Sequence, residues 1–154
     1  MFKRSTLSPT SRLYDQTSFY PAFERDISSA HHRIIIESPF ITARRFYTLL
    51  PLIKDAVRHG VTVIVNTRNP DEHEPVMREQ ALECIAMLQS LDITVLLTAG
   101  LHRKIAVLDT VTWEGSLNIL SQADSCEIMR RTQSPKYAAQ LLRFTKLAKW
   151  YNEG

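Results

Sequence analysis

The chain has 154 residues, about the size of one domain, which excludes two full catalytic domains. Hydrophobic residues make up 44% of it and charged residues 23%, with 4 glycines, which excludes a disordered chain or a collagen-like repeat. A total of 19 Lys and Arg against 16 Asp and Glu gives a net charge of +3, which favours anionic partners such as nucleic acid without requiring them.

Cysteine content and hydropathy predict a cytoplasmic protein. Cys84 and Cys126 are too few for a disulfide framework and lack the clustered spacing of a zinc site. The basic start of the sequence has no apolar stretch of signal-peptide length after it, and no run approaches the ~18 apolar residues of a membrane span. We therefore expect reduced thiols and no membrane partner.

The first residues differ in character from the rest. Residues 1–16 are polar and without periodicity, and they predict a flexible N-terminal arm. The remainder, residues 17–154, shows no linker or internal repeat and is expected to form one catalytic domain.

Apolar residues at helical spacing alternate with short β-branched runs over the first two thirds of the chain. These patterns predict helices over 19–30, 45–59 and 76–90, and strands over 33–37, 61–65 and 93–97. Further on, strands 104–109 and 111–113 are separated by almost no loop, which indicates an antiparallel hairpin. A strand over 126–131 and a helix over 135–151 follow. The fold class expected is α/β, with a single mixed β-sheet flanked by helices on both faces.

The segment that begins at Leu101 carries a group of residues suited to a phosphodiester. On a strand, His102 and Lys104 lie on one face because their spacing is two. A neutral imidazole can attack phosphorus or move a proton, and an ammonium offers three donors to phosphate oxygens. Ser116 and Asn118 add neutral donors without a competing negative charge.

The order and spacing of these residues resemble the signature of the phospholipase D superfamily, written here as His102-x-Lys104-(x4)-Asp109 and then Gly115-Ser116-x-Asn118. The resemblance is closest to the short bacterial members with one motif per chain, the endonuclease-like branch. It implies a phospholipase D-like fold that extends from about residue 17 to the end of the chain.

Two acidic residues belong to this resemblance. Glu127 lies where related nucleases carry a glutamate that supports the histidine. Five residues separate Asp109 from Gly115, where the family usually has six. That departure leaves two interpretations of Asp109 open, a group that orients the imidazole and a turn former.

The resemblance also implies a mechanism. One histidine attacks phosphorus to form a phosphohistidine, and a second protonates the leaving oxygen. This chain has a single motif, so a homodimer with a shared active site is expected. Lysines take the place of a metal, and no cofactor is required. The stretch Asp71–Glu74 is acidic, but adjacent loop residues rarely converge on one ion, so we expect no metal there.

Four arginines are candidates for binding the phosphates of nucleic acid, because ligands of α/β sheets usually bind beyond the carboxyl ends of the strands. They are Arg44, Arg45, Arg68 and Arg103.

The sequence leaves two alternatives to a metal-independent nuclease that cleaves DNA or RNA. One is a non-catalytic nucleic-acid-binding or dimerisation module of a larger restriction, repair or helicase system. The other is a phospholipase, although no clear amphipathic surface supports it. A further domain or partner protein that targets the chain is compatible with each.

Overall fold

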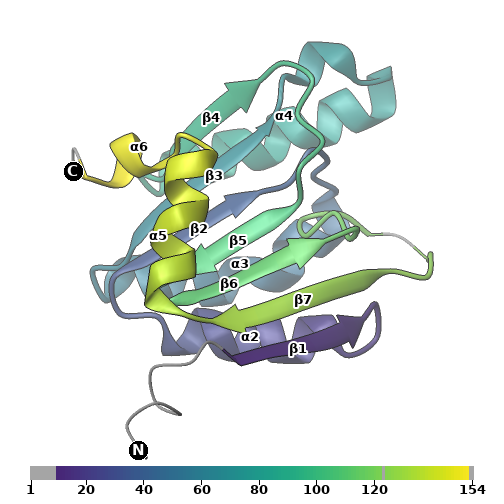
Figure 1. Ribbon diagram of the computed structural model, residues 1–154. Helices are drawn as coiled ribbons and strands as arrows, with labels where there is room; N and C mark the ends of the chain where they lie inside the picture. The colour runs from purple at the N-terminus through teal and green to yellow at the C-terminus, as the bar shows by residue number, and fades with distance from the viewer. Residues whose placement is uncertain (1–9, 123, 153–154) are drawn as a thin grey trace, which may run out of the picture.

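The computed structural model describes residues 10–122 and 124–152 (Figure 1). One mixed sheet has the strand order β1-β7-β6-β5-β2-β3-β4, and helices cover both of its faces. The expected α/β class and sheet type are therefore confirmed. The strands are β1 (Thr10–Asp15), β2 (Arg33–Glu37), β3 (Thr62–Arg68), β4 (Thr94–Thr98), β5 (Ile105–Leu108), β6 (Val111–Gly115) and β7 (Ile128–Gln133). The helices are α2 (Phe19–Ser29), α3 (Ala43–Arg58), the 3-10 turn η1 (Pro70–Glu72), α4 (Pro75–Ser90), α5 (Pro135–Phe144) and α6 (Ala148–Asn152).

Strand direction brings distant segments of the chain to one end of the sheet. Strands β2, β3 and β4 are parallel, whereas β5, β6, β7 and β1 each run antiparallel to their neighbours. Glu37, the last residue of β2, is therefore opposite Ile105, the first residue of β5. Gly115, the last residue of β6, is opposite Met129 near the start of β7. We call this side, where β2 and β6 end and β5 and β7 begin, the carboxyl end of the sheet.

Two apolar layers hold the sheet between its helices. Helices α2, α3 and α4 pack on one face around Phe19, Phe46 and Trp113, all fully buried. Helices α5 and α6 lie on the opposite face, where Leu142 packs with the alternate side chains of β2, β3 and β5. Figure 1 shows α5 crossing the front of the sheet. The period-2 alternation of strand side chains explains both layers.

The N-terminal segment differs from expectation. Residues 10–15, predicted within a flexible arm, form strand β1, which pairs antiparallel with β7 at the rim of the sheet. Tyr14 packs edge-on against Trp113 with ring centroids 4.9 Å apart. Residues 1–9 of the predicted arm lie outside the described residues.

The predicted C-terminal helix is also interrupted. It ends at Phe144 and resumes at Ala148, with Lys146 between them at a φ of 63°. Among the described residues, no helix has the length and apolar character needed to cross a bilayer.

Candidate active site

His102 and Lys104 lie in the connection that leads into β5, at the carboxyl end of the sheet. The strand begins only at Ile105, so these residues precede it rather than belong to it, contrary to expectation. The His102 side chain is exposed, and its imidazole makes no hydrogen bond to any described residue. Lys104 folds back so that its Nζ donates to the main-chain carbonyl of His102 at 2.6 Å.

The second half of the motif begins at a close contact between two strands. A Cβ on Gly115 would lie 2.1 Å from the carbonyl oxygen of Ile128, so only glycine fits there. The next residue, Ser116, donates its N–H to that same carbonyl at 2.9 Å, and its Oγ accepts the N–H of Ile128 at 3.0 Å. The Gly-Ser pair therefore fixes Ser116 at the end of β6.

Glu127 is joined to this serine. The Ser116 hydroxyl donates to Glu127 Oε1 at 2.5 Å, and the Ser125 hydroxyl donates to the other carboxylate oxygen. The Ser116 hydrogen bond, then that of Ser125, and the nearby Lys104 charge lower the pKa of Glu127 below its usual value. The carboxylate is therefore held in its ionised form beside the lysine of the motif.

An open cavity of about 380 Å³ lies next to this cluster and is lined by Asn118, Glu127 and Arg45 among others. The Asn118 Oδ1 is buried and accepts no hydrogen bond from the described residues. The Arg45 guanidinium stacks on the Tyr20 ring, 3.6 Å from its centroid. The Tyr20 hydroxyl in turn donates to the carbonyl of Ile119 at 2.7 Å, which ties the ring to the chain beside Asn118. The cavity is thus lined by the neutral amide of Asn118, the cation of Arg45 and the anion of Glu127.

The loop that carries Asn118 is anchored to the start of α3. Leu120 donates its N–H to Ser38 Oγ at 3.0 Å and accepts the N–H of Thr42 at 3.0 Å. Gln122 donates its N–H to Thr42 Oγ1 at 2.9 Å. These contacts fix the loop against the end of β2.

The four candidate arginines take different roles. Arg44 is exposed on the first turn of α3, and Arg45 lines the cavity. The other two bind protein groups, although the Arg103 side chain stays partly exposed. Arg68 donates to the carbonyl of Leu101, and Arg103 forms a two-pronged ion pair with the buried Glu37 at 2.9 and 2.8 Å. Both arginines therefore have protein acceptors within one chain, and their binding to phosphate stays a prediction.

Asp109 does not lie at the site. It occupies the two-residue turn between β5 and β6, at the opposite end of β5 from His102, with a φ of 53°. Its carboxylate accepts the N–H groups of His31, His32 and Arg33 at 2.8 to 3.0 Å. Of the two interpretations, turn former is the one that the structure supports.

Glu127 is bound to serines and not to the imidazole within one chain. Within one chain its oxygens are occupied by Ser116 and Ser125, and no hydrogen bond joins it to His102. The motif residues brought together are Lys104, Ser116, Asn118 and Glu127. His102 does not line the cavity and is joined to this group through its main-chain carbonyl, which accepts from Lys104.

The sequence analysis missed a buried polar group beside the motif. Glu37 accepts the amide of Asn66 at 2.8 Å, and Thr98 donates to Asn66 Oδ1 at 2.8 Å. The available signal was an acidic residue that directly continues the apolar run Ile34–Ile36. A buried carboxylate needs a cationic partner, and Arg103 supplies it. Among the described residues, no group of three or more His, Cys, Asp or Glu is arranged to hold a metal.

Comparison with known proteins finds a family that covers most of the chain. The family described as "Cardiolipin synthase, PLD-like domain" matches residues 23–148, most of the chain. No curated protein matches it in sequence.

Several solved structures share the fold. The phospholipase D family member Nuc from Salmonella typhimurium aligns with a TM-score of 0.73 at 16% identity, covering 89% of this chain and 91% of Nuc. NucT from Helicobacter pylori aligns with a TM-score of 0.74 at 17% identity, covering 94% and 98%. The archaeal chromatin protein TrmBL2 aligns with a TM-score of 0.61 at 13% identity, covering 92% of this chain and 53% of that protein. Identities this low establish the fold alone, whereas the family match extends over both halves of the motif. The chain therefore belongs to the family of phospholipase D-like domains.

Proposed function

We propose that this chain is a metal-independent phosphodiesterase that cleaves nucleic acid, with His102 as the nucleophile. One observation carries the proposal. Two segments separated in sequence, the connection before β5 and the connection between β6 and β7, bring Lys104, Ser116 and Asn118 to the same end of the sheet, beside His102. Phosphoryl transfer depends mainly on positioning and on stabilising charge at the phosphate oxygens, and these groups supply both.

The proposed reaction has two displacements. A ring nitrogen of His102 attacks phosphorus, so a P–N bond forms while the P–O bond to the leaving group breaks, and a second imidazole gives the leaving oxygen its proton. Water then attacks phosphorus while the second imidazole, now neutral, takes a proton from that water. The P–N bond breaks and His102 is restored. Lys104, Ser116 and Asn118 donate to the phosphate oxygens in both steps.

The second imidazole is proposed to come from another copy of the chain. Of the 5 histidines, His31 and His32 lie beside Asp109 at the opposite end of the sheet, and His59 ends α3 there. His73 stacks on Phe40 with centroids 4.9 Å apart, and burial lowers its pKa. None of these four lines the cavity. A two-fold dimer would instead place a second His102 opposite the first.

Nucleic acid is the proposed substrate because the charges near the site favour a polyanion. Arg44 and Arg45 both lie on the first turn of α3, next to the loop that carries Asn118, and the chain has a net charge of +3. The resemblance of the motif to the endonuclease-like branch supports the same substrate class.

Cleavage of single- and double-stranded DNA and RNA in excess EDTA tests the proposal. We expect the purified chain to cleave at least one of these substrates, and His102→Ala to abolish cleavage. His32→Ala is the matched control, because His32 is exposed and lies at the opposite end of the sheet.

Other outcomes of the same assay point elsewhere. Salt-sensitive binding without cleavage, unchanged by His102→Ala, would favour a non-catalytic nucleic-acid-binding module. Hydrolysis of phospholipid vesicles in place of nucleic acid would favour a phospholipase.

A further inference from the structure

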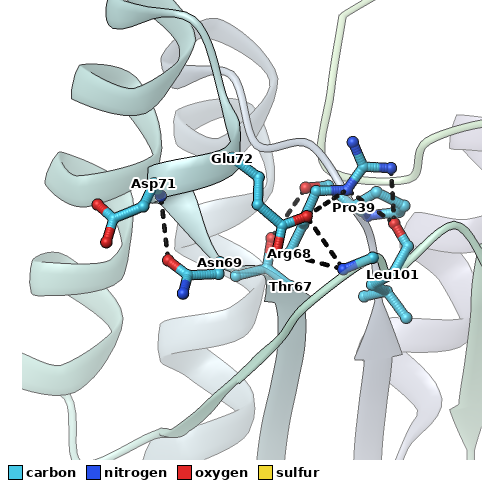
Figure 2. Close-up of polar contacts among 8 residues, drawn as sticks. Pro39, Thr67, Arg68, Asn69, Asp71, Glu72 and Leu101 are labelled. Atoms are coloured by element: carbon cyan, nitrogen blue, oxygen red, sulfur yellow. Dashed lines mark hydrogen bonds and ion pairs between the residues drawn. The ribbon is translucent and has the colours of Figure 1, made fainter.

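The main chain just before His102 is held by an arginine from another strand. Arg68, the last residue of β3, donates Nε and Nη2 to the carbonyl oxygen of Leu101 at 2.9 and 2.8 Å (Figure 2). Its side chain is only 14% exposed and lies over the Phe40 ring, 5.0 Å from the centroid. Hydrogen bonds from a charged donor are about twice as strong as neutral ones, so this carbonyl is firmly placed.

The N–H of Gly100, one residue before Leu101, is held by Glu72 of η1. Both of its carboxylate oxygens accept the N–H of Gly100, at 3.0 and 3.2 Å, and Oε1 lies 3.9 Å from Arg68 Nε. Figure 2 shows Glu72 and Arg68 on the same side of the Leu101 segment. Gly100 has a φ of 70°, a conformation that favours glycine and lets the chain turn at this point. The N–H of Gly100 and the carbonyl of Leu101 are therefore each bound by one member of the same ion pair.

The residue after His102 is fixed as well. Arg103 is bound to the buried Glu37, which also accepts a hydrogen bond from Asn66. His102 is thus bracketed by main-chain and side-chain contacts on both sides. Its own imidazole makes no hydrogen bond to the described residues, so the direction of the ring depends on the main chain.

We propose that Arg68 and Glu72 are positioning residues that fix the peptide groups of Gly100 and Leu101 and so aim the imidazole of His102. The inference rests on the proposed function in one respect, that His102 is the nucleophile. A nucleophile displaced by about 1 Å can lose about a hundredfold in rate, so such a contact acts on turnover. Arg68 does not bind the substrate phosphate in this account, because its donors are directed at Leu101 and its side chain is mostly buried.

Arg68→Met removes both hydrogen bonds to the Leu101 carbonyl. Arg68→Lys keeps the positive charge and can make one of these two hydrogen bonds. Glu72→Gln removes the ion pair with Arg68. The matched control is Asp71→Asn, because Asp71 lies in the same turn but pairs with Arg78 of α4 at 3.1 Å instead of with the His102 loop. Activity is measured on bis(p-nitrophenyl) phosphate in EDTA. The position of the His102 ring is followed independently through its Cε1–Hε1 signal in NMR spectra of the protein without substrate.

We expect Arg68→Met to lower kcat by about tenfold or more with KM unchanged, and to shift or broaden the His102 signal. Arg68→Lys should recover part of the loss, Glu72→Gln should lose less than Arg68→Met, and Asp71→Asn should match the wild-type chain. If Arg68→Met matches Asp71→Asn in kcat and in the His102 signal, the inference is overturned. A raised KM with kcat intact also overturns it, since that result identifies Arg68 as a phosphate contact.

The two proposals fail separately. If the wild-type chain cleaves no phosphodiester, the proposed function fails, and the NMR comparison still decides the positioning role. A His102 signal that changes in Arg68→Met but not in Asp71→Asn supports it. A signal that stays the same in both overturns it.

Discussion

Asp109 and His102 lie at opposite ends of strand β5, so the carboxylate and the imidazole of the motif do not meet within one chain. Asp109 instead binds the N–H groups of three residues that lead into β2. The motif therefore combines residues of two kinds. His102 and Lys104 lie at the carboxyl end of the sheet, and Asp109 secures the turn of the β5–β6 hairpin at the other end.

Asp109→Ala should reduce stability without affecting the chemistry. Removing the acceptor of three main-chain N–H groups should lower the free energy of unfolding by about 1–2 kcal/mol. Denaturant unfolding measures this loss, and cleavage per folded molecule should stay at the wild-type level. A loss of cleavage in a fully folded Asp109→Ala protein would contradict the structural role.

The contribution of Asp109 should also depend on pH. Partial burial raises its pKa, but the N–H groups of His31, Arg33 and His32 outweigh burial and leave the pKa below its usual value. A carboxyl whose pKa is lower in the folded state stabilises the protein above the pKa of the unfolded chain, about 3.9. This stability is lost as the pH falls through the folded pKa. The Tm difference between wild type and Asp109→Asn should therefore be constant near neutral pH and shrink below about pH 4.

Ser116→Ala should raise the pKa of Glu127. The Ser116 hydroxyl is the largest cause of the lowered value, so its removal leaves only Ser125 and the Lys104 charge to favour the ionised form. The side-chain carboxyl ¹³C shift of Glu127, followed against pH, measures the change. An unchanged titration would mean that the short Ser116 hydrogen bond does not govern this carboxylate.

Gly115→Ala should be severely destabilising. Its Cβ would lie 2.1 Å from the Ile128 carbonyl, so β6 and β7 would have to separate at the carboxyl end of the sheet. We expect a loss of more than about 2 kcal/mol in denaturant unfolding. Gly60→Ala is the matched control. Gly60 has a φ of 86° but open space around it, so only backbone strain of about 1 kcal/mol applies. Equal losses in the two variants would contradict the steric account.

Arg44→Gln should weaken binding to nucleic acid of any sequence. The slope of the logarithm of the binding constant against the logarithm of the salt concentration should become shallower by the amount expected for about one phosphate contact. Arg44 is exposed on the first turn of α3, near the site. Arg58→Gln is the control, because Arg58 lies at the other end of the same helix and pairs with Asp55 at 2.9 Å. The measurement is the binding constant as a function of salt concentration. Identical salt slopes for the two variants would show that Arg44 does not contact the phosphates.

The sequence predicted those parts of the fold that are governed by local patterns. The run Arg33–Glu37 is a buried strand as expected, because its three isoleucines leave few alternatives. Strand β1 was missed because Leu13 and Tyr14 are its only large apolar residues, and its pairing with β7 joins distant segments. The break after Phe144 was missed because Lys146 adopts a positive φ where neither Gly nor Pro marks the turn.

The same limit applies to the site. Spacing was enough to single out Lys104, Ser116 and Asn118 as candidates, and the structure brings them to one end of the sheet. The roles of Arg68 and Arg103 depend on the Leu101 carbonyl and on Glu37, whose distances in sequence are 33 and 66 residues. Such partners are set by strand order, which local periodicity does not encode.

We propose that His102 carries the chemistry in a site shared by two copies of the chain. The most direct test of this proposal is the cleavage activity, in excess EDTA, of a heterodimer with one wild-type and one His102→Ala chain, purified through two different affinity tags. A shared site needs both imidazoles, so we predict activity far below half that of the wild-type homodimer and close to that of the doubly substituted protein. Activity of about half the wild-type value would show that each chain works alone and would contradict the account.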